Sequence, residues 1–329
     1  MKLKFASQSY DRVRALIDGS IKPDGIELEH EEVFPAFMFE RAIAGGEFDL
    51  IEMGFTFYLG TLMQENPPFV AIPAFLSRSF RHSAVYINTS KAITQPKDLI
   101  GKRVGELFCY GHDAGIWAKG VLSDEYGVPA DSYSYAIGGV DFPSKKWDWL
   151  PWGIPPNVKA EHIGMERMLG PMLEAGEIDA LVSAIVPPTL LAGSKNVKRL
   201  FDDHEALERA WFKKTGIFPI MHVVVVRREL YEQHPWIARS FYDALCAAKD
   251  VVTTAYKGKE GHMHRLFMIP WLTNLVEENR ALMGDDYWPY GVAKNHAAID
   301  AFLRFHYEQG ISKRRWRPEE IFAAETLTD

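Results

Sequence analysis

The sequence predicts an α/β protein built from two similar lobes, which two crossover strands connect and a cleft separates. Strand and helix patterns alternate as β-α-β-α-β at the start of the chain, an order typical of a mostly parallel sheet. The pattern of residues 44–55 (AGGEFDLIEMGF) returns at 174–185 (EAGEIDALVSAI), which indicates a second, similar unit. Two further strand-like segments, 82–90 and 220–230, have no helix beside them and are suited to join the lobes.

The first lobe begins with an alternating strand at 2–7, a helix at 11–21 and a second alternating strand at 26–33. A helix follows from residue 35 and ends at Gly45-Gly46, before an apolar strand that carries residues 49–53.

The second lobe repeats this order. Residues 98–107 predict a helix start and a strand, 111–128 a loop and a helix, and 162–185 a helix and a buried strand. In the repeated segment, residues 46–49 (Gly-Glu-Phe-Asp) match 176–179 (Gly-Glu-Ile-Asp).

The crossovers place the lobe boundaries near residues 84 and 225. We therefore expect lobe one to comprise 1–84 plus 226–329, and lobe two to comprise 85–225.

The C-terminal third has helical apolar spacing in three segments, 235–256, 265–284 and 295–310, which we expect to pack mainly on lobe one. Residues 142–157 are rich in tryptophan and proline and predict an ordered loop.

Composition narrows the functional classes. The 329 residues carry a formal net charge of -7, which disfavours a general nucleic-acid or acidic-membrane surface. Two cysteines are too few for a disulfide framework, and they do not have the spacing of a zinc site. No apolar run is long enough for a membrane helix, and the first residues show no secretory signal, so we expect a cytoplasmic protein without membrane partners.

Ligands of open parallel sheets bind beyond the carboxyl ends of the strands, and in a two-lobed protein these ends face one cleft. This rule selects candidate residues after the predicted strands and beside the crossovers: Glu52, Arg78, Arg81, His82, Tyr110, Gly111, His112, Asp113, Ser183 and His222.

Arg78 and Arg81 suggest an anion site, because a guanidinium suits bidentate binding of a carboxylate. The alternative is a solvated loop or an ion pair between the lobes. On a regular strand Arg81 and His82 point to opposite faces, so both reach one site only if the chain turns there.

Residues 110–115 join a strand to the start of a helix, where free backbone N–H groups and the helix dipole favour an anion. The alternative is that Asp113 simply caps this helix.

His82 and His222 flank the two crossovers and are candidates for proton transfer. The alternative for each is a hydrogen-bonded histidine of the core. Glu52 follows an apolar strand and needs a partner, which an arginine would supply. His112 and Asp113 together with Glu52 offer metal-ligating atoms, but no helical pair of ligands supports a metal site.

Five segments resemble the 4,5-dihydroxyphthalate decarboxylase family, which has a type II periplasmic-binding-protein-like fold. The resemblance runs from about Lys2 to about Phe322, although the tryptophan-rich segment 145–157 has no place in it. The segments that carry it are FDLIEMGFTFYL (48–59), LSRSFRHSAVYIN (76–88), YGHDAGIWAKGVLSDEYGV (110–128), TGIFPIMHVVVVRRELYEQHPW (215–236) and WPYGVAKNHAAIDAFLRFHYEQGI (288–311).

This resemblance implies non-oxidative decarboxylation of a hydroxylated aromatic acid, most simply 4,5-dihydroxyphthalate, to a dihydroxybenzoate and CO2. Arg78 and Arg81 would then hold a carboxylate, and His82 or His222 would protonate the ring carbon. Glu52 or His112 would engage the phenol. Trp117 and Tyr110 would pack on the ring, with Gly111 and Ser183 beside it.

The hydroxylated ring accepts the electron pair in this chemistry, so the mechanism requires no cofactor, and a divalent metal stays possible. The expected partner is a small aromatic carboxylate, and a homo-oligomer is possible. Two alternatives stay open: a solute-binding protein for an aromatic or dicarboxylic acid, and a synthase-like relative of the same fold. Release of CO2 would distinguish an enzyme from a binding protein.

Overall fold

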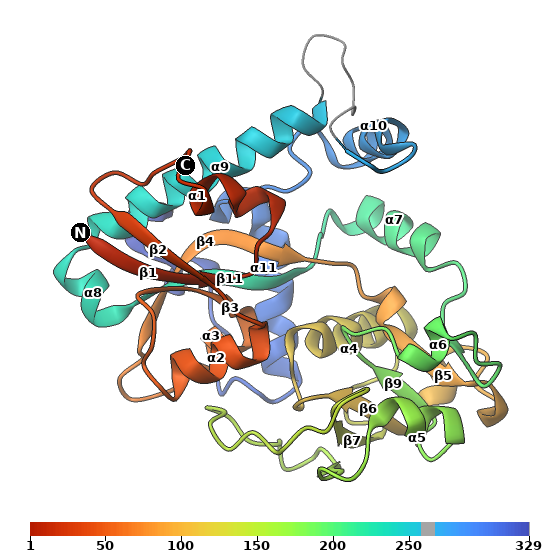
Figure 1. Cartoon of the computed structure of the whole chain (residues 1–329). Coiled ribbons are helices and arrows are strands. Elements are labelled where there is room, and N and C mark those ends of the chain that lie inside the picture. Colours follow the sequence, from red (N-terminus) through yellow and green to blue (C-terminus); the bar gives the residue numbers. More distant parts are fainter. Residues whose placement is uncertain (258–266, 329) are drawn as a thin grey trace.

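The protein has two lobes, each built around its own sheet (Figure 1). The structure is a computed structural model that describes residues 1–257 and 267–328. Strands of mixed direction form both sheets, and helices cover both faces of each, as the α/β pattern of the sequence predicts.

The first sheet has five strands in the spatial order β2 (Glu27–Glu32), β1 (Lys2–Ser7), β3 (Leu50–Gly54), β11 (Ile220–Arg227) and β4 (Phe69–Arg78). Strands β2, β1 and β3 are parallel, whereas β11 runs antiparallel to both β3 and β4. The four consecutive valines 223–226 of β11 are fully buried, because both faces of this central strand are covered.

Helices lie on both faces of this sheet. One face carries η1 (Asp11–Val13), α1 (Arg14–Ile17) and the long α9 (Trp236–Lys257), and the other carries α2 (Pro35–Ile43) and α3 (Phe55–Thr61) (Figure 1). The helix that the sequence predicts at 11–21 is shorter in the structure, where a 3-10 turn is followed by one α-helical turn that ends at Ile17.

The second sheet has six strands in the spatial order β10 (Val197–Arg199), β5 (Val85–Asn88), β9 (Ala180–Val182), β6 (Arg103–Leu107), β7 (Ser134–Gly138) and β8 (Ala160–His162). Strands β9, β6, β7 and β8 are parallel, and β5 runs antiparallel to β9. The helices of this lobe are α4 (Asp113–Tyr126), α5 (Leu169–Ala175), α6 (Pro188–Leu191) and α7 (His204–Thr215). Short 3-10 turns lie at η2 (His82–Ala84), η3 (Thr89–Lys91) and η4 (Pro96–Leu99).

The repeat seen in the sequence is also a repeat of the structure. Asp49 donates its backbone N–H to the Lys4 carbonyl at 3.0 Å, and its carboxylate accepts the Lys4 N–H at 2.9 Å. Asp179 makes the same pair of contacts with Arg103, both at 2.8 Å. Each aspartate therefore ties the strand that follows it, β3 or β9, to the neighbouring parallel strand.

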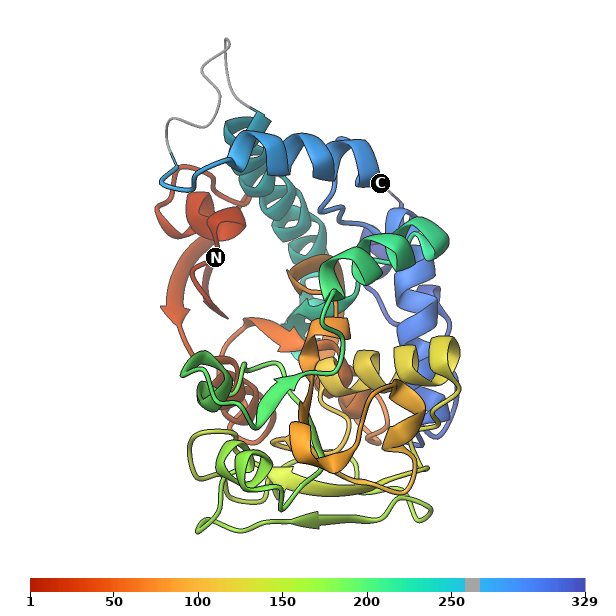
Figure 2. The same ribbon diagram turned by 90° about the vertical axis from the view of Figure 1, so that its right-hand side faces the viewer.

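The chain passes between the lobes twice, after β4 and before β11 (Figure 2). The outgoing segment contains η2 and enters β5, as expected for a crossover at 82–90. Strand β11 lies entirely in the first sheet, so the predicted boundary at 225/226 falls inside this strand. The proposed limits 1–84 plus 226–329 and 85–225 stay predictions.

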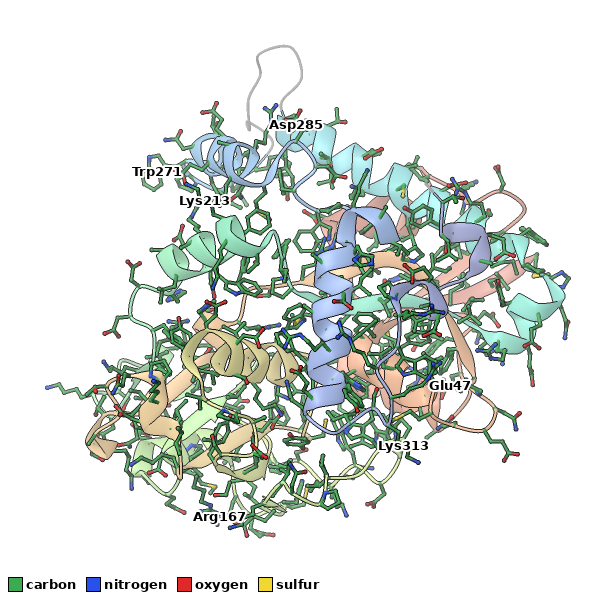
Figure 3. All side chains as sticks on the ribbon, turned by 180° about the vertical axis from the view of Figure 1, so that it is seen from behind. Glu47, Arg167, Lys213, Trp271, Asp285 and Lys313 are labelled. Atoms are coloured by element: carbon green, nitrogen blue, oxygen red, sulfur yellow. The ribbon has the colours of Figure 1, made fainter. Side chains whose placement is uncertain are left out.

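The C-terminal segments include the helices α8 (Arg228–Gln233), α10 (Leu272–Met283) and α11 (Val292–Glu308), with η5 (Pro318–Glu320) and η6 (Ala324–Thr326). The predicted helix at 265–284 begins only at Leu272, and its first two residues lie outside the described residues. Figure 3 shows the reverse side of the molecule, where Lys213, Trp271 and Asp285 lie at the periphery.

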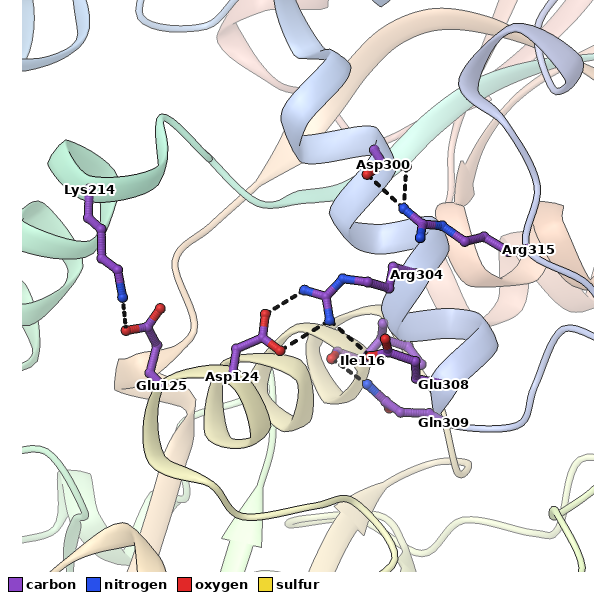
Figure 4. Close-up of polar contacts among 9 residues, drawn as sticks. All are labelled: Ile116, Asp124, Glu125, Lys214, Asp300, Arg304, Glu308, Gln309 and Arg315. Atoms are coloured by element: carbon purple, nitrogen blue, oxygen red, sulfur yellow. Dashed lines mark hydrogen bonds and ion pairs between the residues drawn. The ribbon is translucent and has the colours of Figure 1, made fainter.

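Helix α11 joins the two lobes rather than packing on lobe one alone. Arg304 forms an ion pair with Asp124 of α4, and Gln309 donates from Nε2 to the carbonyl of Ile116 at 2.9 Å (Figure 4). Helix α4, whose first turn reaches the cleft, is therefore held in place by the C-terminal part of the chain.

Candidate active site

A cavity of about 180 Å³ lies between the lobes, where the predicted strand ends meet. An apolar cavity of about 150 Å³ is large enough for benzene, so this volume suits a ligand with one ring. Its lining comes from both lobes and from the segments between them: Phe34, Pro35, Ala36, Phe39, Phe57, Ser77, Arg81, Leu107, Phe108, His112, Asp113, Ala114, Trp147, Ala184, Ile185, Met221 and His222.

Arg81 is the arginine of this cavity. It lies half-buried just before η2, and its Nε donates to the sulfur of Met221 at 3.2 Å, a weak partner for a charged group. Burial lowers the pKa of Arg81 to about 10, and the nearby charges of Asp113 and Glu208 offset only part of this effect. Since no ion pair to a carboxylate is formed by Arg81 within the described chain, the guanidinium can accept an anionic ligand.

His222 of β11 and Glu52 of β3 form a pair on the lobe-one side. The Nδ1 atom of His222 lies 2.6 Å from Oε1 of the fully buried Glu52. Glu52 also accepts the Tyr10 hydroxyl at 2.7 Å and the Gln8 N–H at 3.0 Å. Burial by itself raises the pKa of the Glu52 carboxyl, but His222 and these donors lower it overall. The carboxylate thus fixes the His222 ring and leaves Nε2 for a ligand.

His112 lies on the lobe-two side and is backed by a second buried glutamate. Its Nδ1 is 3.3 Å from Oε1 of Glu106, the fourth residue of β6. Glu106 also accepts from Nζ of the fully buried Lys119 at 2.8 Å and from the N–H of Gly111 at 2.9 Å. The His112 ring nitrogens have no hydrogen-bond partner among the described residues, although the residue is buried.

Asp113 is the first residue of α4, and His112 occupies the N-cap position. The Asp113 carboxylate reaches the other lobe and accepts the Thr56 N–H at 2.7 Å. Burial raises the pKa of Asp113, and the proximity of His222 partly opposes this increase. The side chain considered above as a possible helix cap is therefore a contact between the lobes that also lines the cavity.

Aromatic side chains form the walls of the cavity. Phe57 packs against Phe39 with ring centroids 4.9 Å apart, and Phe108 stacks on Trp147 at 4.7 Å. Phe108 has the uncommon backbone angle φ = 61°, which turns the chain directly after β6. The proline-rich segment 142–157 contributes Trp147 and is the ordered loop that the sequence predicts.

A larger cavity of about 540 Å³ adjoins the first one and shares Phe108 and Trp147 with it. We place the chemistry in the smaller cavity because Arg81, His112 and His222 lie there together.

Two predicted site residues lie elsewhere. Arg78 is buried and donates to the carbonyls of Phe218 and Pro289 and, at 2.5 Å, to Oδ1 of Asn295. Its guanidinium therefore stabilises the fold. His82 points away from the cavity into an aromatic cluster that contains Phe201, and burial lowers the pKa of His82 to about 4. The turn at η2 thus directs Arg81 into the cleft and His82 into the core.

The remaining predicted contacts are mostly structural. Tyr110 donates its hydroxyl to the Gln309 carbonyl and lines the larger cavity. Trp117 is fully buried, and its Nε1 donates to the Ile220 carbonyl at 2.7 Å.

Gly111 has φ = 90°, and a Cβ atom there would overlap the side chain of Ile311. Ser183 is buried and exchanges two hydrogen bonds with the backbone of Ile185, which itself lines the cavity.

Sequence reasoning did not identify the aromatic walls formed by Phe39, Phe57 and Trp147. The run of tryptophans at 147–152 was a visible signal for the last of these, whereas the two phenylalanines resemble ordinary helix-packing residues. Within residues 1–257 and 267–328, no group of three or more His, Cys, Asp or Glu side chains is arranged to hold a metal ion. The described helices include none that is long and apolar enough to cross a membrane.

The cavity can bind a small aromatic anion and transfer protons to it, since it combines one arginine, two histidines backed by carboxylates and flat apolar walls. Fold and site together define an enzyme-type cleft on a two-lobed binding-protein fold. The fold is shared with the periplasmic sulfonate-binding protein SsuA from Methylobacillus flagellatus, at 14% identity and a TM-score of 0.54 over 98% of this chain and 91% of that one. It is also shared with the alkanesulfonate-binding protein SsuA from Xanthomonas axonopodis, at 12% identity and a TM-score of 0.52 over 98% and 97% of the two chains.

Curated sequences specify the family. A 4,5-dihydroxyphthalate decarboxylase from Comamonas testosteroni is 33% identical over 327 residues, which cover 99% of this chain and 98% of the relative. A second protein of that name, from Pseudomonas putida, is 28% identical over 65% of this chain and 82% of its own length. The chain belongs to the 4,5-dihydroxyphthalate decarboxylase family. No protein-family model matches it.

Proposed function

We propose that this protein is a non-oxidative decarboxylase that converts 4,5-dihydroxyphthalate to 3,4-dihydroxybenzoate and CO2. The observation that carries the proposal is the relationship to a curated decarboxylase of this name over essentially the whole chain. The cavity supports it independently, because its arginine, histidines and aromatic walls match the anionic, acid–base and planar requirements of this reaction.

Substrate binding rests on Arg81 and the aromatic walls. The guanidinium holds a carboxylate through charge-assisted hydrogen bonds, while Phe39, Phe57 and Trp147 contact the ring. The apolar surroundings that these side chains provide strengthen an electrostatic contact relative to one in water.

The reaction itself needs one proton on carbon. His112 accepts the proton of the hydroxyl group para to one carboxylate, and the electron pair moves through the ring to the carbon that bears this carboxylate. Protonated His222 donates its Nε2 proton to that carbon, which gives a non-aromatic dienone.

The bond to the carboxylate then breaks, CO2 leaves, and its bonding electron pair returns to the ring and the phenolate oxygen. His112 returns its proton to this oxygen, and His222 is reprotonated from water. One substrate carboxylate and one proton are thereby converted to CO2 and one new C–H bond.

The ring is the electron acceptor throughout, so the scheme requires no redox or organic cofactor. We route no step through a metal. We also propose that the protein is located in the cytoplasm and forms a homo-oligomer. Cell fractionation would test the location, and light scattering would test the oligomeric state.

The deciding experiment measures CO2 release by the purified protein from 4,5-dihydroxyphthalate. Phthalate is the matched control, since it keeps both carboxylates but lacks the hydroxyl groups that donate electrons. We expect turnover of the first compound only. A tight complex with 4,5-dihydroxyphthalate that releases no CO2 would instead indicate a solute-binding protein.

A further inference from the structure

Each lobe presents one histidine to the cavity, and each histidine has a buried glutamate behind it. His222 contacts Glu52, and His112 lies beside Glu106. The two glutamates lie on strands of different sheets, β3 and β6, and are both fully buried. The two pairs differ in their contact distance, 2.6 Å for His222 and 3.3 Å for His112, and in the number of cations that each carboxylate contacts.

Glu52 has His222 as its cationic partner, and its other described donors are the neutral Tyr10 hydroxyl and Gln8 N–H. A buried carboxylate is costly without a compensating positive charge. A positive charge on His222, whose Nδ1 lies 2.6 Å from the carboxylate, would supply this compensation.

Glu106 already has a cation. Both of its carboxylate oxygens contact Nζ of Lys119, at 2.8 Å and 3.0 Å, and neither side chain is exposed. Burial by itself raises the pKa of Glu106, but the charge of Lys119 and, after it, the contact with His112 lower it overall. A proton on His112 would add a second cation to a carboxylate that is already neutralised.

The wider surroundings of His112 act in the same direction. The charged and titratable groups near it are Glu106, Cys109, Asp113 and Lys119 in its own lobe, and Arg81 and His222 across the cavity. Arg81, Lys119 and an imidazolium at His222 disfavour another positive charge. Asp113 is the one further carboxyl group of this set, and burial raises its pKa.

We infer that Lys119 and Glu106 are positioning residues that keep His112 neutral, so that His112 acts as the base while His222 acts as the acid. This inference rests on the proposed function and divides the two proton transfers between the lobes. Environments that drive the pKa values of two titratable groups apart are the usual way in which one site holds an acid and a base at the same pH.

The packing of the cluster indicates that its geometry is specific. A Cβ atom on Gly115, in the first turn of α4, would overlap Oε1 of Glu106 and crowd the His112 ring. Nζ of Lys119 also lies 3.7 Å from the centre of the Tyr110 ring, which adds a cation–π contact to the ion pair.

The test follows both histidine side chains by NMR in the ligand-free protein, with assignments from His112→Gln and His222→Gln. Between about pH 8 and pH 5, the range in which histidine titrates, we expect His222 to take up its proton at the higher pH. Lys119→Met should move proton uptake by His112 upward by about one pH unit or more, because Glu106 then lacks its cation.

Glu106→Gln should shift proton uptake by His112 in the opposite direction. The double variant Lys119→Met/Glu106→Gln, which buries no net charge, should return it close to the wild-type position. If Lys119→Met does not fold, as judged by circular dichroism, Glu106→Gln and the double variant still carry the test.

The acidic limb of the pH–rate profile should move with His112, so that Lys119→Met loses about tenfold in rate for each pH unit of displacement. Proton uptake by His112 before His222, or an unchanged His112 titration in Lys119→Met and Glu106→Gln, would overturn the inference. A protein that shows the expected titrations but releases no CO2 would overturn the proposed function, and with it the role of His112 as its base.

Discussion

Replacing Arg81 by alanine is expected to weaken substrate binding by about 2–4 kcal/mol and to leave the fold intact. The reason is that Arg81 faces the cavity and has only the Met221 sulfur as a described hydrogen-bond partner. A charge-assisted hydrogen bond contributes about 1.5–3 kcal/mol, and leaving a buried anion unpaired adds to this loss. The corresponding decrease in affinity is about 30- to 1,000-fold.

Arg78→Ala is the matched control, since it removes the same side chain three residues earlier. Arg78 donates three hydrogen bonds to Phe218, Pro289 and Asn295, none of which lines the cavity. We expect a lower melting temperature and an unchanged dissociation constant for the folded fraction.

Isothermal titration calorimetry with 3,4-dihydroxybenzoate and with phthalate, neither of which the protein is expected to turn over, measures the affinity at a temperature where both variants are folded. Thermal unfolding followed by circular dichroism measures the change in stability. The reasoning is refuted if Arg81→Ala binds as tightly as the wild type. It is also refuted if Arg78→Ala loses affinity without losing stability.

Four further predictions concern other parts of the site. His222→Gln should lower kcat by about 10²- to 10⁴-fold with little change in KM. His82→Gln should retain a near-normal kcat, because His82 lies in the aromatic core, and steady-state CO2 release measures both variants. Because the pKa of Glu52 is lowered in the folded protein, its carboxylate stabilises the fold at a pH above the ordinary carboxyl pKa of 4.5. This contribution is lost as the pH falls through the lowered pKa of the folded protein. The difference in melting temperature between wild type and Glu52→Gln should therefore shrink in acid. Gly111→Ala should cost about 1–3 kcal/mol of unfolding free energy in urea, through its positive φ and the overlap with a neighbouring side chain, and an unaltered midpoint would contradict this. Trp147→Ala should raise KM about tenfold by opening the wall between the two cavities, and an unchanged KM would remove this residue from the site.

Local pattern determined much of the architecture. The alternation of residues 2–7 and the apolar run at 50–54 are strands in one sheet, because side-chain periodicity depends only on neighbours in the chain. The repeated aspartates Asp49 and Asp179 mark equivalent positions, since each closes the same two-bond contact with an adjacent parallel strand. The rule that ligands bind beyond the carboxyl ends of strands also selects Arg81, His112 and His222 from the sequence alone.

Tertiary structure decided which of these residues act together. Whether Arg78 or Arg81 enters the cleft depends on the turn at η2, and the two residues lie too close in the sequence for its pattern to separate them. Glu52 and His222 are 170 residues apart and meet only because β11 pairs with β3 in one particular register. The Lys119–Glu106 pair likewise forms only where α4 packs beneath the end of β6, so charge compensation in the core is a property of long-range packing rather than of local sequence.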